Sequence, residues 1–323
     1  MRLVLLGCTG LVGRELVPLL LAAGHTLTVV SRQQRQLDGV SCVQADPSLP
    51  ESWVAGSVLQ QALEQAEGVV NLAGEPIAEK RWTSAHLEVL RRSRIDTTRH
   101  LVAAINANPT PPQVLVSASA VGFYGTSETA SFSEDSPAGA DVLGKLCAQW
   151  EAAAQEVNPS TRLVITRIGI VLAADGGALG KMLPIFRAGF GGPIGSGQQW
   201  MSWIARADLC GLIAAALTDA SLQGTYNATA PNPVSMREFC SELGRALRRP
   251  SLLPVPGAVL KLLLGDGAEV VLQGTAQLGA KLAHAHRIGS RGVVGALQRG
   301  VGQRRSDQTA KISSGNPAHP LLA

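Results

Sequence analysis

The chain has 323 residues, of which 46% are hydrophobic and only 16% are charged, so an intrinsically disordered protein is excluded. This length predicts two domains of ordinary size or one large domain. The formal net charge is +4, but residues 280–323 carry a net charge of +6 and residues 1–279 a net charge of −2. Because the basic character belongs to the C-terminal end, neither a nucleic acid nor an anionic membrane is the expected partner of the body.

The cysteines and the N-terminal residues indicate a cytoplasmic protein. The five cysteines are widely spaced and form no C-x-x-C pair, so neither a disulfide framework nor a zinc site is expected, and no other metal site is predicted. The apolar run before Cys8 is shorter than the roughly seven residues that a signal peptide needs. No stretch reaches the ~20 apolar residues of a membrane span.

The N-terminal part is predicted to alternate strands and helices. A continuously apolar strand at residues 3–6 precedes a glycine-rich turn at 7–13, a helix at 14–23 and a second strand at 27–30. Strands that are apolar throughout are typical of parallel sheets covered on both faces. Further strands are expected at residues 69–73, 114–117 and 163–166, and helices at 84–106 and 145–157. This alternation predicts an α/β fold, a Rossmann-like doubly wound parallel sheet.

The glycine turn predicts a dinucleotide site. Gly7, Gly10 and Gly13 stand between a buried strand and a helix, where backbone N–H groups hold a pyrophosphate. The second strand ends at Ser31 and Arg32; an arginine there suits the 2′-phosphate of NADP, whereas an acidic residue suits NAD. NADP(H) is therefore favoured, and NAD(H) stays open. A turn without a ligand and a solvated loop charge at position 32 are the alternatives. The expected cofactor-binding residues are Gly7, Thr9, Gly10, Leu11, Val12, Gly13, Ser31, Arg32, Asn71, Leu72, Ala73 and Gly74.

The second half is less regular. Residues 175–197 are rich in glycine and predicted irregular, and helices are expected at 208–217, 236–247 and 258–264. We expect an NADP-binding domain at residues 1–172, to which later segments could return, and a smaller substrate-side region at 173–275. The aromatic-free basic tail at residues 276–323 is predicted to be disordered.

Three motifs resemble those of the extended short-chain dehydrogenase/reductase superfamily: G-x-x-G-x-x-G at residues 7–13, N-x-A-G at 71–74 and S-A-x-x-x-Y-G at 119–125. The likeness is closer to its epimerase family proteins, which have an NAD-dependent epimerase/dehydratase domain and a short C-terminal domain of unknown function. The resemblance spans residue 1 to about 275; beyond it, we hypothesise that the tail is translated out of the family's reading frame. Runs at residues 71–77, 80–82, 93–95, 146–151, 180–184 and 191–197 carry this closer likeness.

This resemblance implies a catalytic Tyr and, four residues later on one helix face, a Lys that makes its phenol more acidic. Glu151 resembles the acid that ends this helix, and counting back eight residues places Leu143 at the Tyr position and Cys147 at the Lys position. Neither side chain can perform that acid–base chemistry. Lys145 is about 200° round the helix from the pair and is expected to point elsewhere.

Other residues are therefore the candidates for catalysis and substrate binding. Tyr124 is the best remaining acid and Ser119 could bind a substrate oxygen; their alternatives are an aromatic pocket wall and a turn hydroxyl. Cys147 is a buried thiol or a reactive one. The expected substrate-binding residues are Glu75, Arg81, Trp82, Gln198 and Trp200.

These residues are compatible with two alternative functions. The first is an NADP-dependent oxidoreductase or epimerase that acts on a small or nucleotide-linked carbonyl or sugar. The second is an NADP(H)-binding regulatory or scaffold protein without catalysis. The sequence favours the enzyme slightly, with a small-molecule substrate as partner, and leaves a homodimer open.

Overall fold

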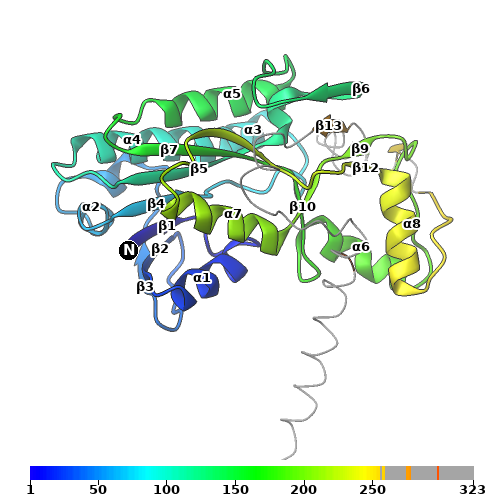
Figure 1. The fold of residues 1–323 in the computed structure, drawn as a ribbon, viewed down its shortest axis with the longest axis horizontal. Coiled ribbons are helices and arrows are strands. Elements are labelled where there is room, and N and C mark those ends of the chain that lie inside the picture. The colour runs from blue at the N-terminus through cyan, green and yellow to red at the C-terminus, as the bar shows by residue number, and fades with distance from the viewer. Residues whose placement is uncertain (255–256, 259–273, 278–296, 298–323) are drawn as a thin grey trace, which may run out of the picture.

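The fold is centred on a parallel sheet with helices on both faces, and a smaller region lies at one end (Figure 1). The computed structural model describes residues 1–254, 257–258, 274–277 and 297. Seven strands pair in parallel in the order β11-β7-β5-β4-β1-β2-β3. The predicted doubly wound α/β fold is confirmed. The strands are β1 (Arg2–Leu6), β2 (Thr26–Ser31), β3 (Ser41–Gln44), β4 (Gly68–Asn71), β5 (Val114–Ala120), β7 (Arg162–Ile168) and β11 (Gly224–Ala228).

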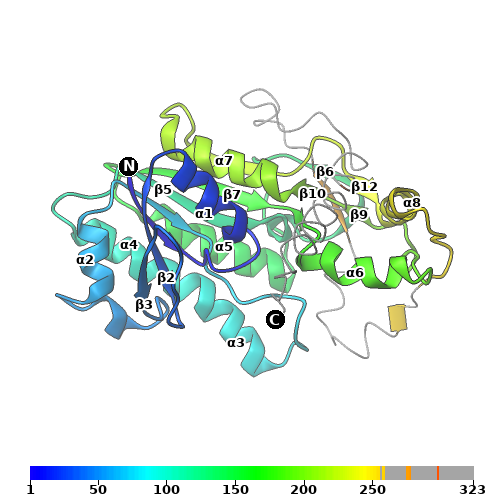
Figure 2. The ribbon, with the colours of Figure 1, turned by 90° about the horizontal axis from the view of Figure 1, so that it is seen from below.

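Apolar side chains on both faces of the central strands explain this architecture. Leu5 of β1 lies in register between Val29 of β2 and Val70 of β4, and all three are fully buried. Each such side chain stabilises the fold by roughly 1.5–3 kcal/mol. Helices α1 (Gly13–Ala22) and α7 (Arg206–Thr218) cover one face, and α2 (Val58–Glu64), α4 (Thr97–Ala107) and α5 (Val142–Gln155) cover the other (Figures 1 and 2).

The helix predicted over residues 84–106 is interrupted. It consists of α3 (Ser84–Arg91), a π-helical turn η2 (Arg92–Asp96) and α4. Single π-helical turns occur frequently at functional sites. Helix α5 begins earlier than predicted, because the Asp141 carboxylate caps it by accepting the Gly144 N–H at 2.6 Å.

The smaller region has its own apolar core. It contains α6 (Gly177–Arg187) and α8 (Met236–Leu247), with the short strands β8 (Ile170–Leu172), β9 (Trp200–Met201), β10 (Trp203–Ala205) and β12 (Val234–Ser235). The prediction of irregular structure over residues 175–197 is wrong for the α6 segment. Leu179, Leu183 and Phe186 are buried at helical spacing. Gly180 and Pro184, which lie between them, obscure this pattern.

Several sequence predictions concern the last part of the chain. β13 (Thr275–Gln277) pairs in parallel with β6 (Ser127–Phe132). The predicted helix at 258–264 lies almost wholly outside the described residues. So does the predicted disordered tail, except for β13 and Leu297, which is buried in the smaller core. β11 joins the sheet although it follows residue 173, and the domain boundaries stay a prediction. Within the described residues, no helix is long and apolar enough to cross a membrane.

Candidate cofactor and substrate site

The three glycines of the turn have three different surroundings. Gly7 has a φ of +74°, and a Cβ there would lie 2.5 Å from the Ala73 backbone nitrogen. A Cβ on Gly13 would lie 1.7 Å from the Cys8 carbonyl oxygen, whereas one on Gly10 would find its nearest neighbour at 3.7 Å. Gly7 therefore makes the tight turn and Gly13 lets α1 pack closely. Gly10 leaves its backbone open to a ligand, which matches the requirements of a dinucleotide loop.

Helix α1 begins at the end of this loop. Its N-cap residue, Val12, has no side-chain cap, and Thr9 and Gly10 are exposed. The first N–H groups of a helix carry partial positive charge and bind anions such as a pyrophosphate. The loop residues therefore fit a dinucleotide.

The loop is also anchored to the smaller region. The Leu11 side chain packs against the Gly176–Gly177 turn, where a Cβ on either glycine would lie 2.9 Å from it. Arg206, at the start of α7, donates to the Leu11 carbonyl at 3.3 Å and forms ion pairs of 2.7 Å with Glu15 and Asp175. These contacts hold the glycine loop at a fixed place relative to the substrate-side elements.

Arg32 extends into solvent where β2 ends. Its side chain is 63% exposed, and its Nη2 lies 3.4 Å from Glu75, which follows β4 and also pairs with Lys80 at 3.4 Å. At this length, with Arg32 largely in solvent, the ion pair contributes little free energy and leaves most of the Arg32 guanidinium available to other groups. Ser31 is buried, and its hydroxyl accepts the Gln33 N–H at 3.2 Å. The pair Arg32–Glu75 thus spans the edge of the sheet between β2 and β4.

Asn71 supports the segment after β4. Its side-chain amide donates to the Thr98 hydroxyl at 2.9 Å, and its oxygen accepts the Ala73 N–H at 3.2 Å. Asn71 is fully buried, whereas Gly74 is exposed. Because the backbone of Leu72 and Ala73 lies against Gly7, this segment continues the surface of the glycine loop towards β5.

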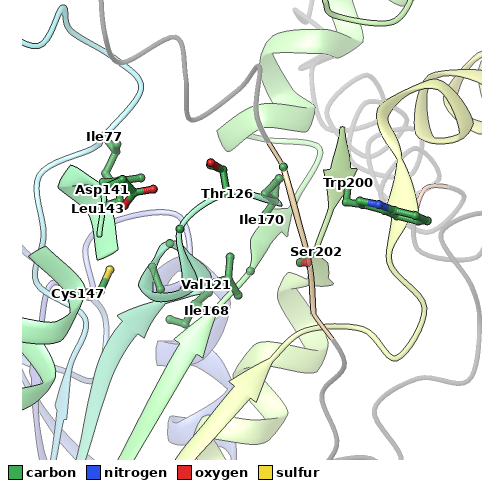
Figure 3. A pocket seen from close by; sticks show the side chains of 15 residues that line it. Ile77, Val121, Thr126, Asp141, Leu143, Cys147, Ile168, Ile170, Trp200 and Ser202 are labelled. Atoms are coloured by element: carbon green, nitrogen blue, oxygen red, sulfur yellow. The ribbon is translucent and has the colours of Figure 1, made fainter. Parts of the chain in front are cut away.

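A pocket of about 250 Å³ lies at the carboxyl ends of β5 and β7 (Figure 3). Ligands of open α/β sheets bind at this edge. The pocket wall is mostly apolar, and among the described residues its only charged side chain is Asp141. The main apolar side chains are Ile77, Val121, Leu143, Ile168, Ile170 and Trp200, and the polar ones are Thr126, Asp141, Cys147 and Ser202.

Leu143 and Cys147 both line this pocket from the first turns of α5, opposite Trp200 in Figure 3. Their assignment to the Tyr and Lys positions of the superfamily stays a prediction. Lys145 is exposed on the same helix and does not line the pocket, as expected from its angular position. Burial raises the pKa of the Cys147 thiol to about 12. The thiol is therefore protonated at neutral pH.

Burial should likewise make the other buried thiols unreactive. Burial raises the pKa values of Cys8, Cys147, Cys210 and Cys240 to about 12, whereas Cys42 is half-buried. Because the thiolate is the reactive form, we expect iodoacetamide at pH 8 to label Cys42 first in the native protein. Mass spectrometry against a urea-denatured control measures the order of labelling. Labelling of Cys147 as fast as in the denatured chain would contradict the structure.

Ser119 and Tyr124 face a buried polar network instead of the pocket. The Ser119 hydroxyl donates to Glu151 at 2.6 Å, and the Tyr124 hydroxyl donates to Asn227 at 2.6 Å and accepts from Arg167 at 2.8 Å. Burial raises the pKa of Tyr124. Arg167 and Glu151 form a doubly hydrogen-bonded ion pair with both distances 2.8 Å. The network joins β5, α5, β7 and β11, and the catalytic roles of Ser119 and Tyr124 stay a prediction.

Of the predicted substrate-binding residues, the structure places Trp200 in the pocket wall. Trp82 does not line the pocket, but its indole N–H donates to the carbonyl of the pocket residue Ile77 at 2.9 Å. Arg81 and Gln198 are exposed and do not line the pocket, and Glu75 lies at the cofactor edge.

Sequence reasoning missed two residues that shape the site. Asp141 lines the pocket, and its position before an apolar helix was a recognisable N-cap signal. Arg167 is a charged residue that follows the apolar run of β7, and its position in a buried strand indicates a buried partner. Neither signal identifies that partner, because Glu151 is brought to Arg167 only by the packing of α5 on the sheet.

Comparison with known proteins agrees with this geometry. A profile of the NAD dependent epimerase/dehydratase family matches residues 3–228. The Arabidopsis thaliana "Epimerase family protein SDR39U1 homolog, chloroplastic" is 46% identical over 270 residues, covering 83% of this chain and 77% of the plant protein. The human epimerase family protein SDR39U1 is 38% identical over 275 residues, covering 84% of this chain and 89% of the human protein.

A crystal structure of human epimerase family protein SDR39U1 (isoform 2) with NADPH is also similar. Its TM-score is 0.83 at 36% identity, covering 93% of this chain and 98% of the human chain. The glycine loop, the fold and these relatives together place the protein in the NAD-dependent epimerase/dehydratase family, in the SDR39U1 branch of the extended short-chain dehydrogenases/reductases.

Proposed function

We propose that this chain binds NADP(H) along the carboxyl edge of its sheet and uses it in an oxidoreductase reaction. Arg32 would hold the 2′-phosphate, the loop at residues 7–13 the pyrophosphate, and the segment after β4 the nicotinamide half. The observation that carries the proposal is the open backbone at Gly10 beside the uncapped start of α1. The NADPH present in the human relative's structure supports the same choice of cofactor.

The pocket favours a small, uncharged substrate. When bound, NADPH would supply a hydride, which the carbonyl carbon of a substrate can accept. A nucleotide-linked sugar would also bring two phosphates, whereas the described pocket wall has no lysine or arginine to bind them. We therefore favour an aldehyde or ketone small enough for about 250 Å³. Its oxygen, if it faces α5, would meet the protonated Cys147 thiol, which can donate a hydrogen bond.

A regulatory NADP(H)-binding protein is the second candidate. It is favoured by the engagement of the Ser119 and Tyr124 hydroxyls in the buried network, away from the pocket. NADPH oxidation measured over a panel of apolar aldehydes, ketones and nucleotide-sugars separates the candidates. Turnover of small carbonyls supports the oxidoreductase, and tight NADPH binding without turnover of any of them supports the regulatory protein.

Substitution of Arg32 tests directly whether NADP(H) is the preferred cofactor. We expect Arg32→Ala to weaken NADPH binding about 10- to 100-fold, the range for losing hydrogen bonds between charged groups, and to leave NADH binding nearly unchanged. Titration calorimetry with both cofactors measures this. Arg99→Ala, an exposed arginine on α4, is the control. Equal binding of NADPH and NADH to the unmutated protein would contradict the assignment.

A further inference from the structure

Arg94 is a buried arginine with no acidic partner. It lies in the π-helical turn η2 and is 8% exposed. One guanidinium nitrogen donates to the Glu75 carbonyl at 2.9 Å and another to the Leu90 carbonyl at 3.3 Å. Among the described residues, no carboxylate lies within 4.0 Å of its nitrogens. Its burial lowers the pKa of Arg94.

Arg167, which is 5% exposed, is the other buried arginine among the described residues, and it is compensated. Arg167 has the Glu151 carboxylate. Burying a charge without such a partner is costly, so an uncompensated arginine indicates a ligand that completes its hydrogen bonds.

The position of Arg94 indicates which ligand. Its guanidinium lies against the exposed Gly74, where a Cβ would be 3.0 Å from Cζ, and 5.4 Å from the centre of the Trp150 ring. Its charge also acts on the thiol of Cys147, which lines the pocket. Gly74 follows β4, and β4 lies in the sheet between β1, which carries the glycine loop, and β5, which borders the pocket.

A dinucleotide that extends from Arg32 past Gly10 to the pocket would therefore place its second ribose next to Arg94. We infer that Arg94 binds the nicotinamide ribose of NADP(H) and supplies, from the turn between α3 and α4, a positive charge beside position 147. The resemblance gives that position to a lysine, and here it is Cys147. The inference rests on the proposed NADP(H) function. Trp150 would be a positioning residue that holds the guanidinium plane.

Three probes of increasing length test this inference by binding alone. Adenosine 2′,5′-bisphosphate reaches only the first phosphate, 2′-phospho-ADP-ribose adds the second phosphate and ribose, and NADPH adds the ring. We expect Arg94→Met to weaken the binding of NADPH and of 2′-phospho-ADP-ribose at least about tenfold. The affinity for adenosine 2′,5′-bisphosphate should change less than twofold. Arg94→Lys should recover part of the loss. Arg92→Met, exposed in the same turn, should change none of the three.

Other results have distinct meanings. Unchanged binding of all three probes to Arg94→Met would overturn the inference. Equal losses of affinity for all three probes, with a lowered melting temperature, would show that Arg94 has a structural role and would also overturn the inference. If Arg94→Met does not fold, Arg94→Lys and Arg94→Gln are compared in the same way. A loss confined to NADPH would move the contact to the nicotinamide ring and overturn the ribose assignment. Failure of the unmutated protein to bind NADPH would instead refute the proposed function.

Discussion

Replacing Glu151 by alanine should cost about 3–5 kcal/mol of the free energy of unfolding, because it leaves the Arg167 guanidinium buried without its carboxylate. The two side chains are only 4% and 6% exposed, so water cannot compensate for the loss. The Ser119 hydroxyl would lose its acceptor in the same step. Urea denaturation followed by tryptophan fluorescence measures the change.

Glu88→Ala is the matched control for this experiment. Glu88 also pairs with an arginine, Arg91, at 2.8 Å, but the Glu88 side chain is 52% exposed. Pairs in solvent contribute about 0–1 kcal/mol, so this variant should be nearly as stable as the unmutated protein. If Glu151→Ala were destabilised no more than Glu88→Ala, the buried network would not have the structural role assigned to it.

Two alanine substitutions in the glycine loop should have different effects, one on stability and the other on NADPH binding. Gly13→Ala should be destabilised by several kcal/mol, because its Cβ would lie 1.7 Å from the Cys8 carbonyl oxygen and the backbone must move. Gly10→Ala should fold normally, since its Cβ meets nothing closer than 3.7 Å. That methyl group would fill the space proposed for a phosphate. We therefore expect NADPH binding to weaken at least about tenfold, or ~1.4 kcal/mol.

Melting temperatures with and without NADPH measure both effects. Gly211→Ala, in α7 with nothing within 4 Å of the added Cβ, is the control and should keep its NADPH-dependent stabilisation. Unchanged NADPH binding by Gly10→Ala would place the pyrophosphate elsewhere. Normal stability of Gly13→Ala would mean that α1 can move away from β1 without cost.

If Arg94 and Arg32 bind the two ends of the cofactor, Glu75 connects them. Its carboxylate pairs with Arg32, and its carbonyl accepts a hydrogen bond from Arg94. In this structure the segment after β4 thus contacts both arginines assigned to the cofactor. Charged side chains thus lie at the edge of the sheet proposed for the cofactor, whereas the pocket wall is mostly apolar.

The sequence by itself determined the glycine loop and the five inner strands of the sheet, but it did not predict the edge strands β3 and β11. Residues 3–6, 27–30 and 114–117 are apolar runs whose burial does not depend on detailed packing, and β1, β2 and β5 contain them. Two requirements of the glycine loop are equally local, the φ of +74° at Gly7 and the close approach of Gly13 to Cys8, whereas the approach of Gly7 to Ala73 is a tertiary contact. Leu143 and Cys147, which the resemblance assigned to the Tyr and Lys positions, both line the pocket, and that assignment stays a prediction.

Only the tertiary structure decided where the polar side chains point. Ser119 donates to a residue 32 positions later, and Tyr124 to one 103 positions later, so local sequence could not show that these hydroxyls face a buried network. Arg94 reads in the sequence as one of several charges on a polar helix. Its isolation from carboxylates follows from the π-helical turn and from the packing of Gly74 and Trp150 around it. Such contacts join distant parts of the chain, and their free energy depends on burial that only the folded protein creates.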